Sequence, residues 1–168
     1  MSGLFLLAFF AFLIAIIILI TLAVIDMRTM LLPNKYVFPF GALGIIFHLL
    51  TSFYLLSPVD MALGFLAGYG VLWIIRFFGN WYYKTDSLGL GDVKLLGAAG
   101  LWLGPVNVTL AMTLGAAGGL LHGIIVALVN KHRTGIFSLR RLKIPAGPGF
   151  VFGIIVILFT FIFPLFLR

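Results

Sequence analysis

Residues 86–96 read DSLGLGDVKLL, and this stretch opens a long apolar run. Asp92 follows a Gly-Leu-Gly step, Gly89 to Gly91, and Lys94 comes two residues later. Asp26, at the far end of another apolar run, is the only other acidic residue placed to join Asp92. The two aspartates are therefore the candidates for one shared site, provided that the topology brings them to the same face of the protein.

The composition predicts an integral membrane protein. Of the 168 residues, 63% are hydrophobic and only 9% are charged, against roughly 25% charged residues in a soluble domain. The mean hydropathy is +1.26. Unpaired backbone groups are costly in lipid, so only helices or a closed barrel can span it. The apolar runs are continuous rather than alternating, which favours helices, and the length favours a single domain over residues 1–168.

The charge and cysteine counts exclude several other classes. The net charge of +7 is explained by loop lysines and arginines that orient a membrane protein. No basic patch with interleaved aromatic residues appears, so we expect no nucleic-acid partner. The absence of cysteine excludes disulfides, thiolate metal sites and a cysteine nucleophile. The first apolar run has no basic start and no small-residue cleavage site, which predicts a spanning helix rather than a signal peptide.

Hydropathy predicts an all-α, polytopic bundle of about six transmembrane helices. The first, Leu4–Ile25, has a length of about 33 Å, which is one bilayer span. Val93–Val129 is too long for one crossing, and Gly104-Pro105 is its one strong break. The piece before the break is only about 18 Å long, so we expect it to be buried inside the bundle with its Asp92 end recessed. The predicted spans are 4–25, 37–56, 61–78, 92–103, 106–129 and 146–167.

The distribution of basic residues predicts the orientation. Ten of the eleven fall at loops after the first, third and fifth spans, and only Arg168 falls on the other side. The positive-inside rule then places both termini outside the cytoplasm of a multi-pass protein of the inner (cytoplasmic) membrane. Asp26 and Asp92 share the cytoplasmic face, whereas Asp60 lies at the other face as a helix N-terminal residue favoured by the dipole. The ten are Arg28, Lys35, Arg76, Lys84, Lys94, Lys131, Arg133, Arg140, Arg141 and Lys143.

Glycines recur at four-residue spacing, which indicates close helix packing in lipid. They are Gly64/Gly68, Gly100/Gly104, Gly115/Gly119/Gly123 and Gly149/Gly153. His48 and His122 lie within predicted spans, and each is expected to be a hydrogen-bonding group of the bundle rather than a metal ligand, because no second ligand sits beside either at helical spacing.

Two carboxylates at the depth of the bilayer indicate a catalytic site. An aspartate at a helix centre costs about 2.5–3.5 kcal/mol on insertion scales. Two that lie close share a proton, as aspartic peptidases require: one accepts a proton from the attacking water and the other donates to the scissile carbonyl. Because the pair titrates as a unit, acid and base are not assigned. The alternatives are structural, with Asp92 stabilising a helix N-terminus and Asp26 pairing with Arg28.

The sequence resembles the type IV prepilin peptidases, a family of aspartic membrane proteases. The resemblance rests on three elements in the family's order: DMRT at 26–29 followed by LPN at 32–34, the GLGDVKLL core at 89–96, and IPAGPG at 144–149. It implies cleavage of leaders from prepilins or pseudopilins on the cytoplasmic side, with Asp26 and Asp92 as the catalytic residues. It implies no metal and no organic cofactor.

The resemblance also frames the remaining expectations. Many bacterial members carry a further domain with paired Cys-x-x-Cys motifs and methylate the new terminus, so this cysteine-free chain looks like a peptidase-only form. The alternatives to a prepilin peptidase are a Gly-x-Gly-Asp intramembrane protease with other substrates, and a non-catalytic scaffold or small transporter. The sequence leaves the oligomeric state open.

Weaker roles are expected for the residues around the two aspartates. Gly89 and Gly91 would let a substrate backbone approach, and Pro33 ends the first helix. Asn34 would cap the second helix, with a hydrogen bond near the site as the alternative. Lys94 is expected to be a charge that orients the chain in the membrane. The alternatives for Lys94 are an ion pair with Asp86 or Asp92, or attraction of an acidic substrate residue. Asp86 is expected to hold a basic leader. The basic loop 130–145 is expected to set topology and to contact anionic lipid.

Overall fold

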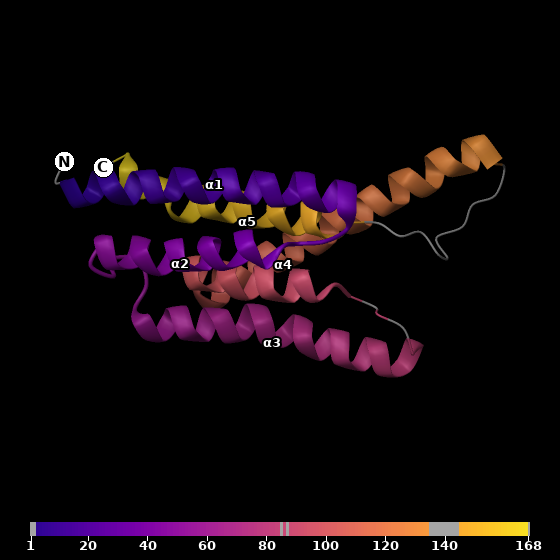
Figure 1. Cartoon of the computed structure of the whole chain (residues 1–168), viewed down its shortest axis with the longest axis horizontal. Coiled ribbons are helices and arrows are strands. Elements are labelled where there is room, and N and C mark those ends of the chain that lie inside the picture. The colour runs from indigo at the N-terminus through magenta and orange to yellow at the C-terminus, as the bar shows by residue number, and fades with distance from the viewer. Residues whose placement is uncertain (1–2, 85, 87, 135–144, 168) are drawn as a thin grey trace.

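The computed structural model describes residues 3–84, 86, 88–134 and 145–167, with backbone only for 129–134. Within these residues the protein is all-helical and contains no strand (Figure 1). The elements are α1 Gly3–Thr29, α2 Asn34–Leu50, α3 Pro58–Tyr83, α4 Leu90–Thr134, α5 Gly147–Phe161 and the 3₁₀ helix η1 Phe163–Phe166. Most of the predicted basic loop 130–145, including Arg140, Arg141, Lys143 and the motif residue Ile144, lies outside the described residues, as do the side chains of Lys131, His132 and Arg133.

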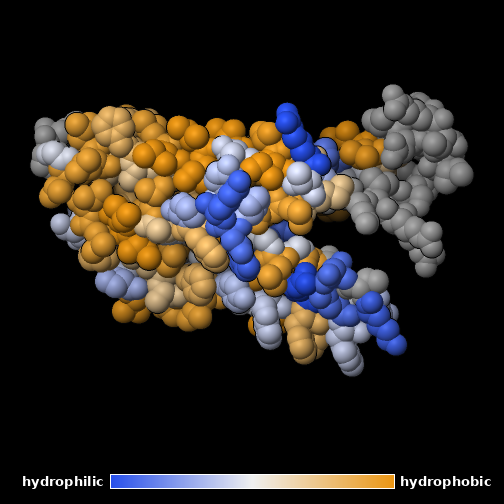
Figure 2. Space-filling view, viewed as in Figure 1, coloured by the Kyte–Doolittle hydropathy of each residue, from blue (hydrophilic) through white to orange (hydrophobic). Residues whose placement is uncertain are grey.

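Four of the described helices are long and apolar enough to cross a bilayer, which agrees with a multi-pass membrane protein. They are Gly3–Thr29, Pro58–Tyr83, Leu90–Leu128 and Gly147–Phe166, and α2 is a shorter apolar helix of 17 residues. The strongly hydrophilic residues visible in Figure 2 gather in the half of the bundle away from the two termini, whereas the rest of the visible surface is mostly apolar.

The predicted break at Gly104-Pro105 is present within α4. Gly104 has φ 72° and ψ 179°, a conformation that a residue with a Cβ rarely adopts. Pro105 lacks the N–H that would continue the hydrogen-bond ladder. A Cβ on Gly68 of α3 would touch both Leu96 and Val108, so the two arms of α4 run back along the same part of α3. The arm before the break is buried as expected, with Val93, Leu96 and Leu103 nearly inaccessible.

Several predicted boundaries were wrong, because helices do not end where the apolar run ends. The helix α1 continues through Thr29, so Asp26 lies inside its last turns rather than in a loop. Conversely, α2 ends at Leu50, six residues before the predicted end, and Ser52 and Phe53 take positive φ values of 52° and 55°.

The ends of α3 also differ from the prediction. A capping box between Ser57 and Asp60 starts the helix at Pro58, which confirms the helix N-terminal role expected of Asp60. At its other end α3 extends through Tyr83 to a left-handed cap at Lys84, so the predicted polar loop after Phe78 is largely helical.

The core is centred on Trp102, which lies on the buried arm of α4. Its indole Nε1 donates to the carbonyl of Phe40 at 2.8 Å, and its own carbonyl lies 3.1 Å from Nε2 of His48. The rings of Phe40 and Trp102 stack with centroids 5.8 Å apart. His48 is fully buried, so the expectation that it serves as a hydrogen-bonding group of the bundle is confirmed. These contacts fix the buried arm of α4 against α2.

Glycine packing joins α3 to α4, as the four-residue spacing predicts. The backbones of Gly64 and Gly100 are so close that a Cβ on either would overlap the other's carbonyl oxygen, and a Cβ on Gly68 would overlap that of Leu96. Gly149 and Gly153 of α5 meet the second arm of α4 in the same way. Gly119 is the exception, because a Cβ there would meet nothing within 4 Å.

We predict that Gly64→Leu destabilises the fold, because its side chain would have to displace the α4 backbone. Overpacking of this kind costs about 1–3 kcal/mol. Gly70→Leu on the same helix is the matched control, since a Cβ there meets nothing within 4 Å. Thermal denaturation in detergent should show a clear loss for the first variant and little change for the second; equal midpoints would contradict the packing.

Candidate active site

Asp26 lies near the C-terminal end of α1 with its side chain directed into the protein. The residue is only 5% exposed. Its Oδ2 atom accepts a hydrogen bond of 3.0 Å from the backbone N–H of Gly147, the first residue of α5. A Cβ on Gly147 would lie 2.5 Å from the same oxygen, so a residue without a side chain is required there. The bond joins the ends of α1 and α5 and stabilises the carboxylate form of Asp26.

Asp92 lies in the first turn of α4 and is 7% exposed. Its Oδ1 atom is buried and has no hydrogen-bond partner among the described residues. Gly89 lies on the side of the other oxygen, and a Cβ there would be 2.8 Å from Oδ2. A buried carboxyl oxygen without a partner is rare and requires an explanation. An oxygen free to meet a ligand or water is a feature of reactive sites.

The fold brings the two carboxyls to the same end of the bundle. The C-terminal end of α1 and the N-terminal ends of α4 and α5 lie together, away from the two chain termini (Figure 1). Asp26 and Asp92 are within range of each other's charge. Asp26 and Arg28 form no ion pair, because among the described residues the single ion pair joins Arg76 to Asp86. The arrangement provides one carboxyl with a donor and one with a free oxygen, a suitable pair for proton transfer to and from water.

The connection between α1 and α2 packs against the start of α4. A Cβ on Gly91 would lie 2.8 Å from the Cβ of Leu32. The absence of a side chain at Gly91 therefore lets the α1–α2 connection pack closely against α4. Pro33 occupies the N-cap of α2 in an extended conformation and offers no side-chain cap.

Asn34 does not cap α2, and the alternative role, a hydrogen bond near the site, is the one present. Asn34 is the first residue of α2, and its Oδ1 atom accepts a 3.2 Å hydrogen bond from Nζ of Lys94. The pair joins α2 to α4 two residues beyond Asp92. Lys94 therefore pairs with neither Asp86 nor Asp92 within the described structure, and its ammonium also lies 6.0 Å from the ring centroid of Phe38.

Asp86 is held apart from the two buried aspartates by contacts to α3. Its Oδ1 atom is 2.6 Å from the Arg76 guanidinium and 3.1 Å from the Asn80 amide. Arg76 also donates to the carbonyl of Leu88, so it binds the segment that leads into α4 at two points. The Asp86 side chain nevertheless remains 78% exposed. Arg76, which the sequence analysis lists only as an orienting charge, thus holds the segment before α4 against α3.

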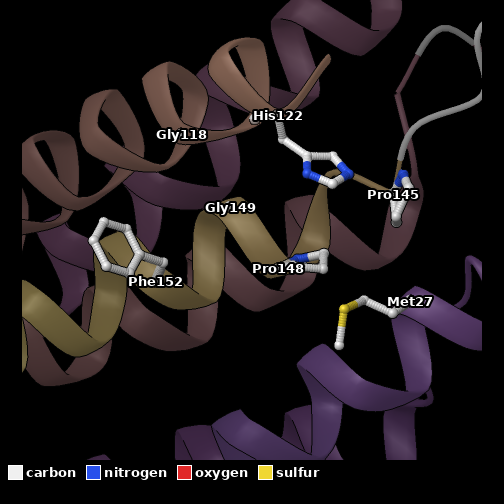
Figure 3. A pocket seen from close by; sticks show the side chains of 8 residues that line it. Met27, Gly118, His122, Pro145, Pro148, Gly149 and Phe152 are labelled. Carbon is white, nitrogen blue, oxygen red and sulfur yellow. The ribbon is translucent and has the colours of Figure 1, made fainter. Parts of the chain in front are cut away.

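A cavity of about 300 Å³ opens beside Met27, between the end of α1, the second arm of α4 and the start of α5 (Figure 3). Its lining is mostly apolar and includes Met27, Gly118, Gly119, His122, Pro148 and Phe152. His122 is exposed at this cavity and makes no hydrogen bond within the described structure, so the expectation that it bonds within the bundle was wrong.

Sequence reasoning missed the parts of the site made by backbone. Gly147 falls in the IPAGPG element, but its sequence context does not reveal an N–H directed at Asp26. The described residues contain no group of three or more histidine, aspartate or glutamate side chains that could hold a metal ion.

The sequence matches the type IV leader peptidase family over residues 12–167. The chain belongs to this family. Its relatives include the prepilin leader peptidase/N-methyltransferase of Escherichia coli (strain K12), which is 38% identical over 113 residues. That match covers 67% of this chain and 49% of the relative. The protein of the same name from Aeromonas hydrophila is 34% identical over 131 residues, covering 78% of this chain and 42% of the relative. The matched part is thus half or less of the length of these two curated relatives, and no solved structure matches the chain.

Proposed function

We propose that this protein is a membrane aspartic endopeptidase that cleaves the leaders of type IV prepilins or pseudopilins, with Asp26 and Asp92 as its catalytic pair. The observation that carries the proposal is two buried carboxyls, within range of each other's charge, at one end of an apolar helical bundle. Membership of the leader peptidase family and the names of the relatives supply the substrate class. Residues 1–168 would act as one membrane-embedded peptidase domain, without a metal or an organic cofactor.

The hydrogen bonds suggest how the pair divides its work. Gly147 donates to Asp26 and so favours the charged form there, whereas Asp92 has a buried oxygen with no donor. In our scheme the shared proton resides on Asp92. Asp26 takes a proton from water as the water attacks the scissile carbonyl carbon, and Asp92 gives its proton to the carbonyl oxygen. When the tetrahedral intermediate breaks down, Asp26 gives its proton to the leaving amine while Asp92 takes back a proton from a hydroxyl of the diol, so the C–N bond breaks, the new carboxyl forms and the pair again holds one proton.

The proposed orientation places this chemistry at the cytoplasmic face. Six membrane-crossing or membrane-buried helices result when the two arms of α4 are counted separately, with both termini outside the cytoplasm. The gathering of hydrophilic side chains at the end that holds Asp26 and Asp92 supports this orientation (Figure 2). The arm 90–103, about 21 Å long, would hold Asp92 below the lipid surface, close to where a membrane-anchored substrate enters the cytoplasm.

Replacing either aspartate by asparagine should abolish cleavage, because the amide keeps the size but cannot hold or accept the shared proton. We expect Asp26→Asn and Asp92→Asn each to lower kcat by at least about 10²-fold in an assay with purified prepilin in detergent or liposomes. Asp60→Asn is the matched control, since Asp60 caps α3 at the opposite end of the bundle. Normal cleavage by both site variants would support a scaffold instead, and a wild type inert on several prepilins would contradict the substrate class.

We further predict that Gly147→Ala impairs catalysis by displacing Asp26, since the new Cβ would lie 2.5 Å from Oδ2. The expected loss in kcat is about tenfold or more, the effect of a misplaced proton-transfer group, with little change in KM. Gly70→Ala has open space for its methyl group and serves as the control. An unchanged kcat with Gly147→Ala would show that the hydrogen bond from the α5 terminus is dispensable.

Asp86 and Lys94 are proposed to guide charged substrate residues rather than to react. The exposed carboxylate of Asp86 could meet a basic leader even while it contacts Arg76. Asp86→Asn should therefore raise KM a few-fold with kcat unchanged, and the effect should shrink at high salt because exposed charges are screened. If the rise in KM were no larger than that of Lys84→Gln, an exposed neighbour on the same connection, this role for Asp86 would be wrong.

A further inference from the structure

An apolar groove runs between α2 and α3, on a different side of the bundle from the cavity described above. Both helices pack against α4, but over their described lengths they do not pack closely against each other. Figure 1 shows the first arm of α4 between them, so this arm forms the floor of the groove. The groove has a volume of about 310 Å³. Its walls include Phe38 and Ile45 of α2 and Phe65 and Tyr69 of α3, and Ala98 lies on its floor.

The walls of the groove are exposed, so the groove opens toward the surrounding membrane. Phe38, Ile45 and Phe65 are all more than one-third exposed. The rings of Phe65 and Tyr69 stack with centroids 5.6 Å apart and form one flat wall. A Cβ on Gly97 would lie 3.1 Å from Tyr69 and 3.2 Å from Phe65, so both residues rest directly on the backbone of α4. An apolar surface of this kind within membrane-spanning helices meets a hydrocarbon partner.

The groove is too narrow for another helix. The stretch of α2 that lines it, residues 37–45, is about 12 Å long, so a volume of about 310 Å³ corresponds to a mean cross-section of about 26 Å². An α-helix with its side chains is about 10–12 Å across, which is a cross-section of roughly 80–110 Å². The occupant that fits this width is a single hydrocarbon chain.

Lys94 places a positive charge at one end of the groove. Its half-buried ammonium has three N–H donors, and the described structure gives it one acceptor, Oδ1 of Asn34 at 3.2 Å. The single ion pair among the described residues lies elsewhere, on α3. Neither Lys94 nor the exposed Lys35 at the start of α2 therefore has a carboxylate partner within the described structure. A phosphate group would accept from the donors of Lys94 that Asn34 does not use.

We propose that this groove binds one anionic phospholipid, with an acyl chain between α2 and α3 and the headgroup phosphate at the Lys94 ammonium. The acyl chain lies along the stacked rings of Phe65 and Tyr69. Lys94 is two residues from Asp92, so the lipid joins α2 and α3 to the arm of α4 that carries this carboxyl. With Asn34 and a phosphate bound, one donor of Lys94 still remains for a charged substrate residue. The binding requires no peptidase activity.

The test measures lipid binding directly in the purified protein. The delipidated protein in non-ionic detergent is titrated with palmitoyl-oleoyl phosphatidylglycerol, or with the phosphatidylcholine that has the same two chains, and native mass spectrometry counts the bound lipids. Thermal denaturation reports whether each variant is folded.

Two variants remove the two halves of the site, and each has a matched control. Ala42→Leu fills the groove, because Ala42 lines it and is exposed. Ala62→Leu makes the same change at an exposed position of α3 outside the groove. Lys94→Gln removes the charge at the end of the groove, and Lys84→Gln removes an exposed charge elsewhere. Ala42→Val is a smaller filling that serves if the leucine variant fails to fold.

We expect the wild type to bind one phosphatidylglycerol molecule, about fivefold more tightly than phosphatidylcholine because its headgroup carries a net negative charge. Ala42→Leu should raise the Kd for phosphatidylglycerol by about tenfold or more, because the added side chain takes the space of the acyl chain. Lys94→Gln should raise that Kd by about fivefold and remove the preference between the two lipids. Ala62→Leu and Lys84→Gln should leave the Kd within about twofold of the wild-type value.

Several outcomes would contradict the lipid site. Equal affinities for all the variants, as expected of lipid that only surrounds the bundle, would overturn it, and so would a wild type that binds no lipid. Equal affinities of the wild type for the two lipids would overturn the anionic headgroup. If Ala42→Leu left lipid binding unchanged and raised the KM for a prepilin, the groove would hold the apolar helix of the substrate, and the lipid site would be wrong.

Discussion

The contact on which the candidate site depends is the hydrogen bond from the Gly147 N–H to Asp26. A carboxylate buried among apolar helices is costly unless donors compensate it, and here the donor is the free N–H at the start of α5. That N–H has no partner within its own helix, so one bond satisfies two groups that would otherwise be unpaired. It also ties α1 to α5 at the end of the bundle where α4 begins. The glycine is required because any side chain would occupy the position of the carboxylate oxygen.

The second constraint is the interruption of α4 at Gly104. Without it, residues 90–134 would form a single rod too long for a bilayer, and the arm that carries Asp92 could not be buried. The break lets the first arm lie against α3 and α2, held by the Gly64–Gly100 approach and by the Trp102 hydrogen bonds. Asp92 is thereby presented from inside the bundle, while the second arm continues to form a wall of the cavity next to Met27.

Sequence reasoning reached the features that follow from hydropathy and from strong local signals. It predicted an all-helical membrane protein, the break at Gly104-Pro105, the burial of the arm before it and the helix N-terminal role of Asp60. Charge counting placed Asp26 and Asp92 at one face, and the structure has them at one end of the bundle. Each of these predictions depends on composition or on residues close together in the chain.

The failures involve contacts that only the folded chain creates. Nothing in the sequence near Asn34 reveals that Lys94, 60 residues later, will donate to it in place of a capping bond. Arg76 contacts both Asp86 and Leu88 because α3 continues past its apolar part to Tyr83. Gly119 has the spacing of a packing glycine in the sequence, and only the positions of α1 and α5 show that it borders a cavity.

The central claim is that the fold brings Asp26 and Asp92 together, and cross-linking tests it directly because the natural chain has no cysteine. Asp26→Cys combined with Asp92→Cys would be treated with short bis-methanethiosulfonate linkers in detergent, then digested with trypsin, which cuts the chain between the two positions. The account predicts that the fragments remain joined until reduction, whereas those of the Asp26→Cys, Asp60→Cys control separate. If the first pair separates while the control stays joined, or if both pairs behave alike, the two aspartates do not form one site.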